Sequence, residues 1–201
     1  MRRYLPTACR MMVRSGAWWV GVMVGVGLTV LVREWPYVNW HSVAAPLDAH
    51  PLLIRHDAKG DGRYLAPRSG RRTHRGIDLA APVGQSVRAI RSGRVVQVGT
   101  HRGLGRFIEL EHRHALRSLY AHLHAVDVAA GARVRQGQVI GAVGKTGNAR
   151  HPWIQSHLHL EVLKDGTPID PQQLGLLVID PQAHPTRHAT IAQASDADGG
   201  Q

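Results

Sequence analysis

The sequence predicts a mainly β domain, built from an antiparallel sheet and placed behind one N-terminal transmembrane helix. An apolar run without charge near the N-terminus predicts the helix. Short runs of alternating apolar and polar residues, separated by glycines between residues 63 and 172, predict the sheet. No stretch of that region suggests a long helix. The 201 residues allow one domain of ordinary size with extensions.

The first 32 residues have the features of a signal anchor. Residues 1–15 carry four arginines and no acid, and residues 16–32 carry no charge. A helix of this length spans about 26 Å, slightly less than a hydrocarbon core of about 30 Å. A cleaved signal peptide is the alternative. The apolar region of a signal peptide is usually shorter than this run and is closely followed by a small-x-small cleavage site, whereas no such site closely follows the run here. We therefore expect a cytoplasmic basic segment over 1–15 and a transmembrane anchor over 16–32. Flanking aromatic residues of the interfacial type support the anchor: Trp18, Trp19, Trp35 and Tyr37.

The rest of the chain divides into three parts. Residues 33–62 mix proline, glycine and polar residues without a sustained period, which predicts a linker with short local structure. Residues 63–172 form the predicted domain, and residues 173–201 a C-terminal tail. Strands are expected over residues 86–90, 93–99, 106–112, 116–123, 133–144 and 157–163.

The composition limits the classes of partner and site. Residues 63–172 contain 17 Lys and Arg against 7 Asp and Glu, a net charge of +10 within a chain total of +11. Such a domain suits an anionic partner. Because the anchor places it outside the cytoplasm, wall polymer or membrane phosphate fits better than nucleic acid. A solvated basic face is the alternative. The single cysteine, Cys9, excludes an internal disulfide framework and a cysteine-based zinc site.

Two histidine motifs predict a metal site. His74 and Asp78 form an HxxxD pattern, and His157 and His159 form an HxH pattern on a predicted strand. Alternation along a strand puts His157, His159 and Glu161 on one face and leucines on the other. A catalytic zinc takes three ligands from His and Asp or Glu and keeps one position for water, whose pKa it lowers. HxxxD plus one histidine of HxH supplies that set and leaves one imidazole over.

A third histidine, His122 in Tyr120-Ala121-His122-Leu123, lies on another predicted strand. If that strand pairs near the HxH strand, His122 adds a second imidazole beside the metal. Two such imidazoles could accept a proton from water and stabilise charge on a scissile amide. Glu161 either orients a neighbouring ligand or is an exposed carboxylate. Arginines near HxxxD either bind wall carboxylates or form a solvated rim: Arg63, Arg71, Arg72 and Arg75. Nine further histidines are expected at the surface: His41, His50, His56, His101, His112, His114, His124, His184 and His188.

Residues 63–171 resemble the lysostaphin-like (LytM-type) zinc metallopeptidases, which cut peptidoglycan cross-bridges. The motifs that carry the resemblance are His74-Arg-Gly-Ile-Asp-Leu-Ala-Ala-Pro, Tyr120-Ala-His-Leu, Gly131-x-x-Val-x-x-Gly-x-x-Ile-Gly, Thr146-Gly-Asn-Ala and His157-Leu-His. The resemblance implies an antiparallel β-sheet groove with zinc at its floor. It also implies that His74, Asp78 and His159 bind Zn²⁺ and that His122 and His157 are catalytic without binding it. The chain departs from the family pattern at Asp61-Gly62-Arg63 and in the bulky loop 151–156, which borders the expected groove.

These features together predict a membrane-anchored zinc metalloendopeptidase that hydrolyses peptide cross-links of peptidoglycan through a zinc-activated water. The expected location is a single-pass membrane protein with its N-terminus in the cytoplasm and its domain on the periplasmic or extracellular side. A non-catalytic envelope module that binds the wall or regulates another hydrolase is the alternative. Gly21 and Gly25 also match the spacing of a helix-dimer motif. A biotinyl-type carrier hairpin around 134–141 is disfavoured, because Lys145 does not match the modified lysine of such carriers.

Overall fold

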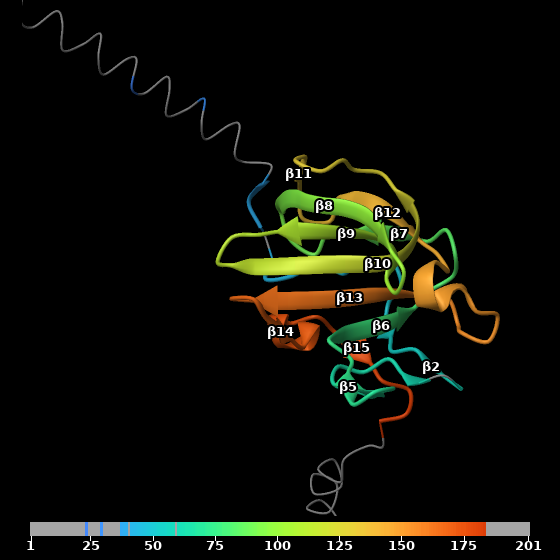
Figure 1. Cartoon of the computed structure of the whole chain (residues 1–201). Coiled ribbons are helices and arrows are strands. Elements are labelled where there is room, and N and C mark those ends of the chain that lie inside the picture. Colours follow the sequence, from blue (N-terminus) through green and yellow to red (C-terminus); the bar gives the residue numbers. More distant parts are fainter. Residues whose placement is uncertain (1–22, 24–28, 30–36, 40, 59, 184–201) are drawn as a thin grey trace, which may run out of the picture.

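Figure 1 shows a computed structural model that describes residues 23, 29, 37–39, 41–58 and 60–183. The predicted anchor lies outside these residues apart from positions 23 and 29, and so do its dimer motif, the basic segment 1–15 and residues 184–201. Within the described part of the chain, no helix is both long enough and apolar enough to cross a membrane. The anchor and the dimer therefore stay predictions.

The domain is built on a nine-stranded antiparallel sheet, which confirms the mainly β, antiparallel part of the predicted fold class (Figure 1). Its main path runs β11 (Arg133–Val134), β8 (Gly93–His101), β9 (Gly105–Glu111), β10 (Leu116–Val126), β12 (Val139–Val143) and β7 (Ser86–Arg88). Strand β13 (His157–Lys164) pairs with β10, β14 (Thr167–Ile169) and β6 (Gly76–Ala80). The expected run 133–144 forms two strands, because Gly137 adopts a positive φ of 76° in a turn between them.

Strand β10 changes partner along its length. Residues 116–121 pair with β13, whereas residues 123–126 pair with β12. The ladder between β10 and β9 shifts register between Tyr120 and Leu123, so His122 lies at an irregularity of the strand. His122 has a φ of +63°, which a residue with a side chain seldom adopts. Such irregularities bend a strand and redirect its side chains.

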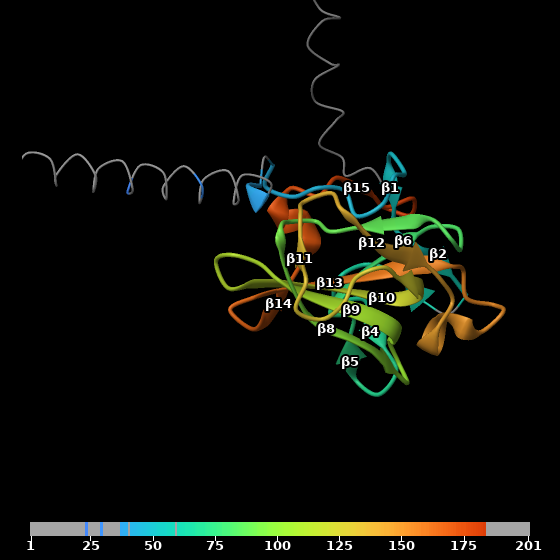
Figure 2. The same ribbon diagram turned by 90° about the horizontal axis from the view of Figure 1, so that it is seen from above.

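Segments on both sides of the predicted domain contribute further elements. The N-terminal segment carries β1 (Leu52–Leu53), β2 (His56–Asp57) and β3 (Gly60–Asp61), and β4 (Pro67–Arg68) and β5 (Arg72–Thr73) follow at the start of the predicted domain. The short 3-10 helices η3 (Gly147–Arg150) and η4 (Pro171–Leu174) follow later, and β15 (Val178–Ile179) lies beyond η4. Strand β15 pairs in parallel with β1, and the two lie together in Figure 2. The segment predicted as a linker is therefore structured over much of its length.

The hydrophobic core extends into this segment. Leu158 and Leu160 of β13 are fully buried, as the predicted alternation requires. Leu47, Leu52 and Ile54 from the predicted linker join the same cluster, each at most 3% exposed. The linker prediction missed this packing because isolated apolar residues between prolines show no period. The three residues bury apolar surface that the sheet would otherwise expose.

One predicted surface histidine is instead buried. His112 is 6% exposed and belongs to a polar network in the core. Its Nδ1–H donates to the Ser92 carbonyl oxygen (3.1 Å), and its Nε2 lies 2.7 Å from the Ser118 hydroxyl. Ser118 contacts the Tyr120 hydroxyl (3.0 Å), which accepts the Ile90 N–H (2.9 Å). This chain of bonds compensates the burial of five polar groups.

His56 is likewise not a free surface residue. Its Nε2 lies 2.7 Å from Asp180 Oδ1 and its Nδ1 lies 3.6 Å from Asp61 Oδ1. Five other histidines are exposed as predicted, and residues 184 and 188 lie outside the described residues: the five are His41, His50, His101, His114 and His124.

The buried His112 predicts a pH dependence of stability. Burial lowers its pKa from 6.5 to about 4, so between these values the unfolded chain binds a proton that the folded chain excludes. The free energy of unfolding should therefore fall as the pH drops from about 6.5 to about 4, with about 3 kcal/mol due to His112. Denaturant unfolding across this range should show a weaker pH dependence in His112→Gln. The exposed matched variant His124→Gln should keep the wild-type slope, and an unchanged slope in His112→Gln would contradict this account.

Candidate metal centre

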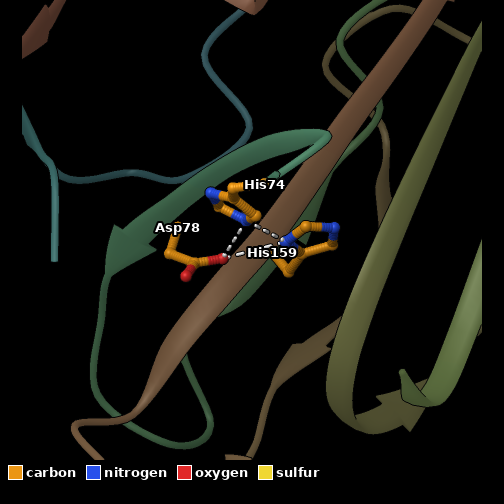
Figure 3. A group of neighbouring side chains, drawn as sticks. All are labelled: His74, Asp78 and His159. Carbon is orange, nitrogen blue, oxygen red and sulfur yellow. Dashed lines mark hydrogen bonds and ion pairs between the residues drawn. The ribbon is translucent and has the colours of Figure 1, made fainter. Parts of the chain in front are cut away.

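Three predicted ligands meet where β6 joins β13. In this antiparallel ladder His159 lies opposite Asp78, and His74 lies in the short connection between β5 and β6. His74, Asp78 and His159 are buried, and each offers one ligand atom within 4.8 Å of the others. Figure 3 shows the two imidazoles and the carboxylate pointing toward one another. The pairing register thus brings together motifs that lie about 80 residues apart in the sequence.

The three ligand atoms form a small triangle. His74 Nε2 lies 3.0 Å from His159 Nδ1 and 3.1 Å from Asp78 Oδ1. Asp78 Oδ1 lies 2.9 Å from His159 Nδ1. Around a tetrahedral zinc with bonds of about 2.0–2.1 Å, ligand atoms stand roughly 3.3 Å apart. Both the donor set and its spacing fit a zinc ion after a small expansion.

Contacts of the other ring nitrogens favour the tautomers that bind a metal. His74 Nδ1–H donates to the Arg63 carbonyl oxygen (2.8 Å), which leaves the lone pair on Nε2. His159 Nε2 lies 4.0 Å from Glu161 Oε2, too far for a hydrogen bond but close enough for this carboxylate to favour a proton on Nε2 and a lone pair on Nδ1. Glu161 also pairs with Arg75 (2.9 Å). Of the two interpretations of Glu161, the geometry favours the one in which it orients a ligand.

The electrostatics favour a positive charge inside the triangle. Burial alone would raise the pKa of Asp78, but its close contacts with the imidazoles of His159 and His74 hold this pKa well below its usual value. Burial would lower the pKa of His159, but its bonds with Asp78 and Glu161 raise it to about 9. The carboxylate stays ionised and the adjacent imidazole attracts a cation, either a proton or a metal ion.

The two remaining predicted site residues lie beside the triangle. The imidazole centroids of His122 and His157 are 4.9 Å apart, and His122 is 5.9 Å from His159. His122 Nδ1–H donates to the Thr146 carbonyl oxygen (3.0 Å), and His157 Nδ1–H donates to that of Gln155 (2.7 Å). Each ring therefore carries a free lone pair on Nε2. Burial lowers the pKa of His122 to about 3 and also lowers the pKa of His157.

The arginines near HxxxD have different surroundings. Arg63 pairs with Asp61, and Arg75 pairs with Glu161, while both side chains stay more than half exposed. Arg71 and Arg72 are also exposed. Two arginines that the sequence analysis did not single out, Arg55 and Arg68, contact Asp78 directly. They lie 23 and 10 residues before Asp78, and no local motif marks them.

Comparison with known proteins agrees with this geometry. Residues 72–171 match the sequence profile of peptidase family M23. The chain is 39% identical over 127 residues to the DD-carboxypeptidase/endopeptidase Mpg of Neisseria meningitidis serogroup B. It is 32% identical over 125 residues to the peptidoglycan DD-endopeptidase ShyB of Vibrio cholerae. These matches cover 63% and 62% of this chain but only 28% of each relative.

A solved structure also supports this family assignment. A zinc-containing peptidase from Vibrio cholerae superposes with a TM-score of 0.52 at 30% identity, covering 66% of this chain and 39% of the other. The sequence match, the fold and the motif residues on or beside β6, β10 and β13 all indicate the same family. The chain therefore belongs to peptidase family M23, with its family domain in residues 72–171.

Proposed function

We propose that the chain is a membrane-anchored zinc metalloendopeptidase that hydrolyses peptide cross-links of bacterial peptidoglycan. The observation that carries the proposal is the meeting of five motif side chains in one buried cluster: His74, Asp78, His122, His157 and His159. Both curated relatives described above are named DD-endopeptidases or DD-carboxypeptidase/endopeptidases. We extend this to the present chain and propose a bond between two D-amino acids as the bond cleaved.

The triangle would hold zinc through His74 Nε2, Asp78 Oδ1 and His159 Nδ1. Zinc bound there supplies a Lewis acid that polarises a scissile carbonyl and lowers the pKa of water. The Arg63 carbonyl oxygen holds His74 in the tautomer that binds a metal, and the nearby Glu161 carboxylate favours the same for His159, so little reorganisation is needed on binding.

His122 and His157 would move the protons of the reaction. Each ring is held by an Nδ1–H bond to a backbone carbonyl, so Nε2 can accept a proton from the attacking water. The resulting imidazolium can return that proton to the leaving amine nitrogen. While charged, it also stabilises the negative charge that develops on the scissile carbonyl oxygen.

The ligand assignment predicts one zinc per chain. His74→Ala and Asp78→Ala should each lose stoichiometric zinc, because two ligands seldom retain the ion through dialysis. Metal analysis of dialysed protein measures this, with circular dichroism to confirm folding. Asp127→Ala removes an exposed carboxylate and should keep its zinc. Zinc retained in a folded His74→Ala would remove His74 from the ligand set.

The catalytic assignment predicts that metal binding and cleavage separate. His122→Ala and His157→Ala should keep zinc and slow cleavage about 100-fold or more, the usual contribution of a general acid or base. Mass spectrometry of fragments released from purified peptidoglycan measures the rate, and a chelator should abolish it. His124→Ala, an exposed neighbour on β10, is the matched control. Zinc-loaded wild type that binds peptidoglycan without cutting it would favour the regulatory module instead.

The contacts of residues 37–41, just after the predicted anchor, support a short connection between the domain and the membrane. The Arg133 guanidinium lies 3.8 Å from the centre of the Tyr37 ring. Asn39 Oδ1 accepts the Ser92 N–H (2.7 Å), and the His41 carbonyl oxygen accepts from Gln136 Nε2 (3.0 Å). Only residues 33–36 lie between the predicted anchor and Tyr37, a reach of roughly 14 Å when extended. We therefore propose that the domain is held close to the membrane.

This arrangement would orient the site away from the membrane. Tyr37 contacts the β11 edge of the sheet, and the metal centre lies on β6 and β13. Along the order β11-β8-β9-β10-β13-β6 this is five strand spacings, or about 24 Å. The candidate site would then face the wall on the periplasmic or extracellular side.

The anchor predicts membrane retention that depends on its apolar run. The wild-type chain should stay in membranes washed with alkaline carbonate, whereas the double variant Val24→Arg/Val26→Arg should be released. Each arginine near the centre of a span costs about 3 kcal/mol of insertion free energy. Leu177→Arg, at an exposed apolar residue of the domain, should remain in the pellet. Release of wild type would exclude the anchor.

A further inference from the structure

A buried arginine lies behind the metal centre. Arg55 is 5% exposed although it precedes the family-matched residues by 17 positions. Its Nη2 donates to Asp78 Oδ2 (2.8 Å), and its Nη1 donates to Asp57 Oδ2. Burying a charge costs several kcal/mol unless a partner compensates it. Both partners of Arg55 are carboxylates, and one of them is a candidate zinc ligand.

The two oxygens of Asp78 have separate partners. Oδ1 faces His74 and His159 at 3.1 and 2.9 Å. Oδ2 is held by Arg55 at 2.8 Å and by Arg68 at 3.3 Å. A carboxylate fixed in this way cannot turn its second oxygen toward the metal without breaking two charge-assisted bonds. The arginines thus define which oxygen is available as a ligand.

The backbone joins the same segment to Asp78. The Arg55 N–H donates to the Asp78 carbonyl oxygen (2.9 Å), and the Asp78 N–H donates to that of Gly62 (2.8 Å). The Gly62 N–H in turn donates to the Arg55 carbonyl oxygen (2.8 Å). A Cβ atom at Gly62 would lie 2.8 Å from the Arg55 oxygen and 2.9 Å from the Asp78 oxygen. This close approach requires glycine and places Arg55 beside the ligand strand.

Asp57 extends the contact to the loop before β13. It accepts the Gln155 N–H (3.0 Å) through the same oxygen that receives Arg55. The Gln155 carbonyl oxygen accepts the His157 Nδ1–H. One short segment, residues 55–57, therefore contacts both a ligand of the proposed zinc and the loop that holds a proposed catalytic histidine.

We propose that Arg55, assisted by Arg68, is a positioning residue that holds Asp78 as a ligand through Oδ1 alone. The inference rests on the proposed zinc site and assigns a role to residues that lie outside the family-matched sequence. It predicts that Arg55 contributes to zinc affinity. Its positive charge beside Asp78 opposes the metal ion, so the proposal requires the gain from orientation to exceed this repulsion.

The test measures zinc affinity of the full chain by competition with a chromophoric chelator. Arg55→Met should weaken zinc binding about 10–100-fold, the usual effect of removing a partner of a metal ligand. Arg55→Lys should recover part of this loss, because it restores one charged donor. Arg88→Met is the matched control, since Arg88 pairs with the exposed Asp48 and should leave the affinity unchanged.

Thermal unfolding of the zinc-free proteins separates positioning from simple stabilisation. A lower melting temperature in Arg55→Met with zinc affinity within twofold of wild type would overturn the proposal, and so would tighter binding. If Arg55→Met does not fold, Arg68→Met at the more exposed partner should weaken zinc binding several-fold, and unchanged affinity there would overturn the shared role. Wild type that binds zinc but leaves peptidoglycan intact would contradict the proposed function and not this inference.

Discussion

The pairing of β13 with β6 on one side and with β10 on the other is the constraint on which the site depends. In this register His159 lies opposite Asp78 and also opposite Ala121, the residue before His122. A slip of one residue would turn His157 and His159 toward the core and the leucines toward the site. The burial of Leu158 and Leu160 therefore maintains the geometry of the metal centre as well as the stability of the domain.

His122 reaches the site because the regular strand geometry of β10 is interrupted at this residue. A positive φ at a residue with a side chain costs on the order of 1–3 kcal/mol. The His122 N–H donates to the Leu104 carbonyl oxygen and the ring donates to that of Thr146, so two bonds maintain the strained conformation. At this same point β10 exchanges β13 for β12 as its partner. The change of partner thus leaves His122 beside the end of the β13 ladder, where the HxH pair begins.

The sequence was sufficient to predict the sheet and the five motif residues, because alternation and short spacing are local signals. HxH on a strand fixes which side chains share a face, and HxxxD fixes two neighbouring ligands. The roles of Arg55 and Asp57, the burial of His112 and the ion pairs of His56 arise from contacts between distant segments, which no periodicity in the sequence indicates. The prolines and glycines around Arg55 indicated a linker. In the structure, Gly62 instead allows this segment to pack closely against Asp78 of β6.

The segments that precede and follow the family-matched residues also contact each other. The folded domain is therefore longer than residues 72–171. Strand β1 pairs with β15, the Ile54 N–H donates to the Ile179 carbonyl oxygen, and His56 contacts Asp180. These contacts fix residues 52–57 from the side opposite Asp78, so the position of Arg55 depends on chain that follows the family domain as well as on chain that precedes it. Residues 72–171 supply all five motif side chains, but the structure surrounding Asp78 is completed by both flanks. The candidate site and the contacts that surround it therefore require the chain from β1 to β15.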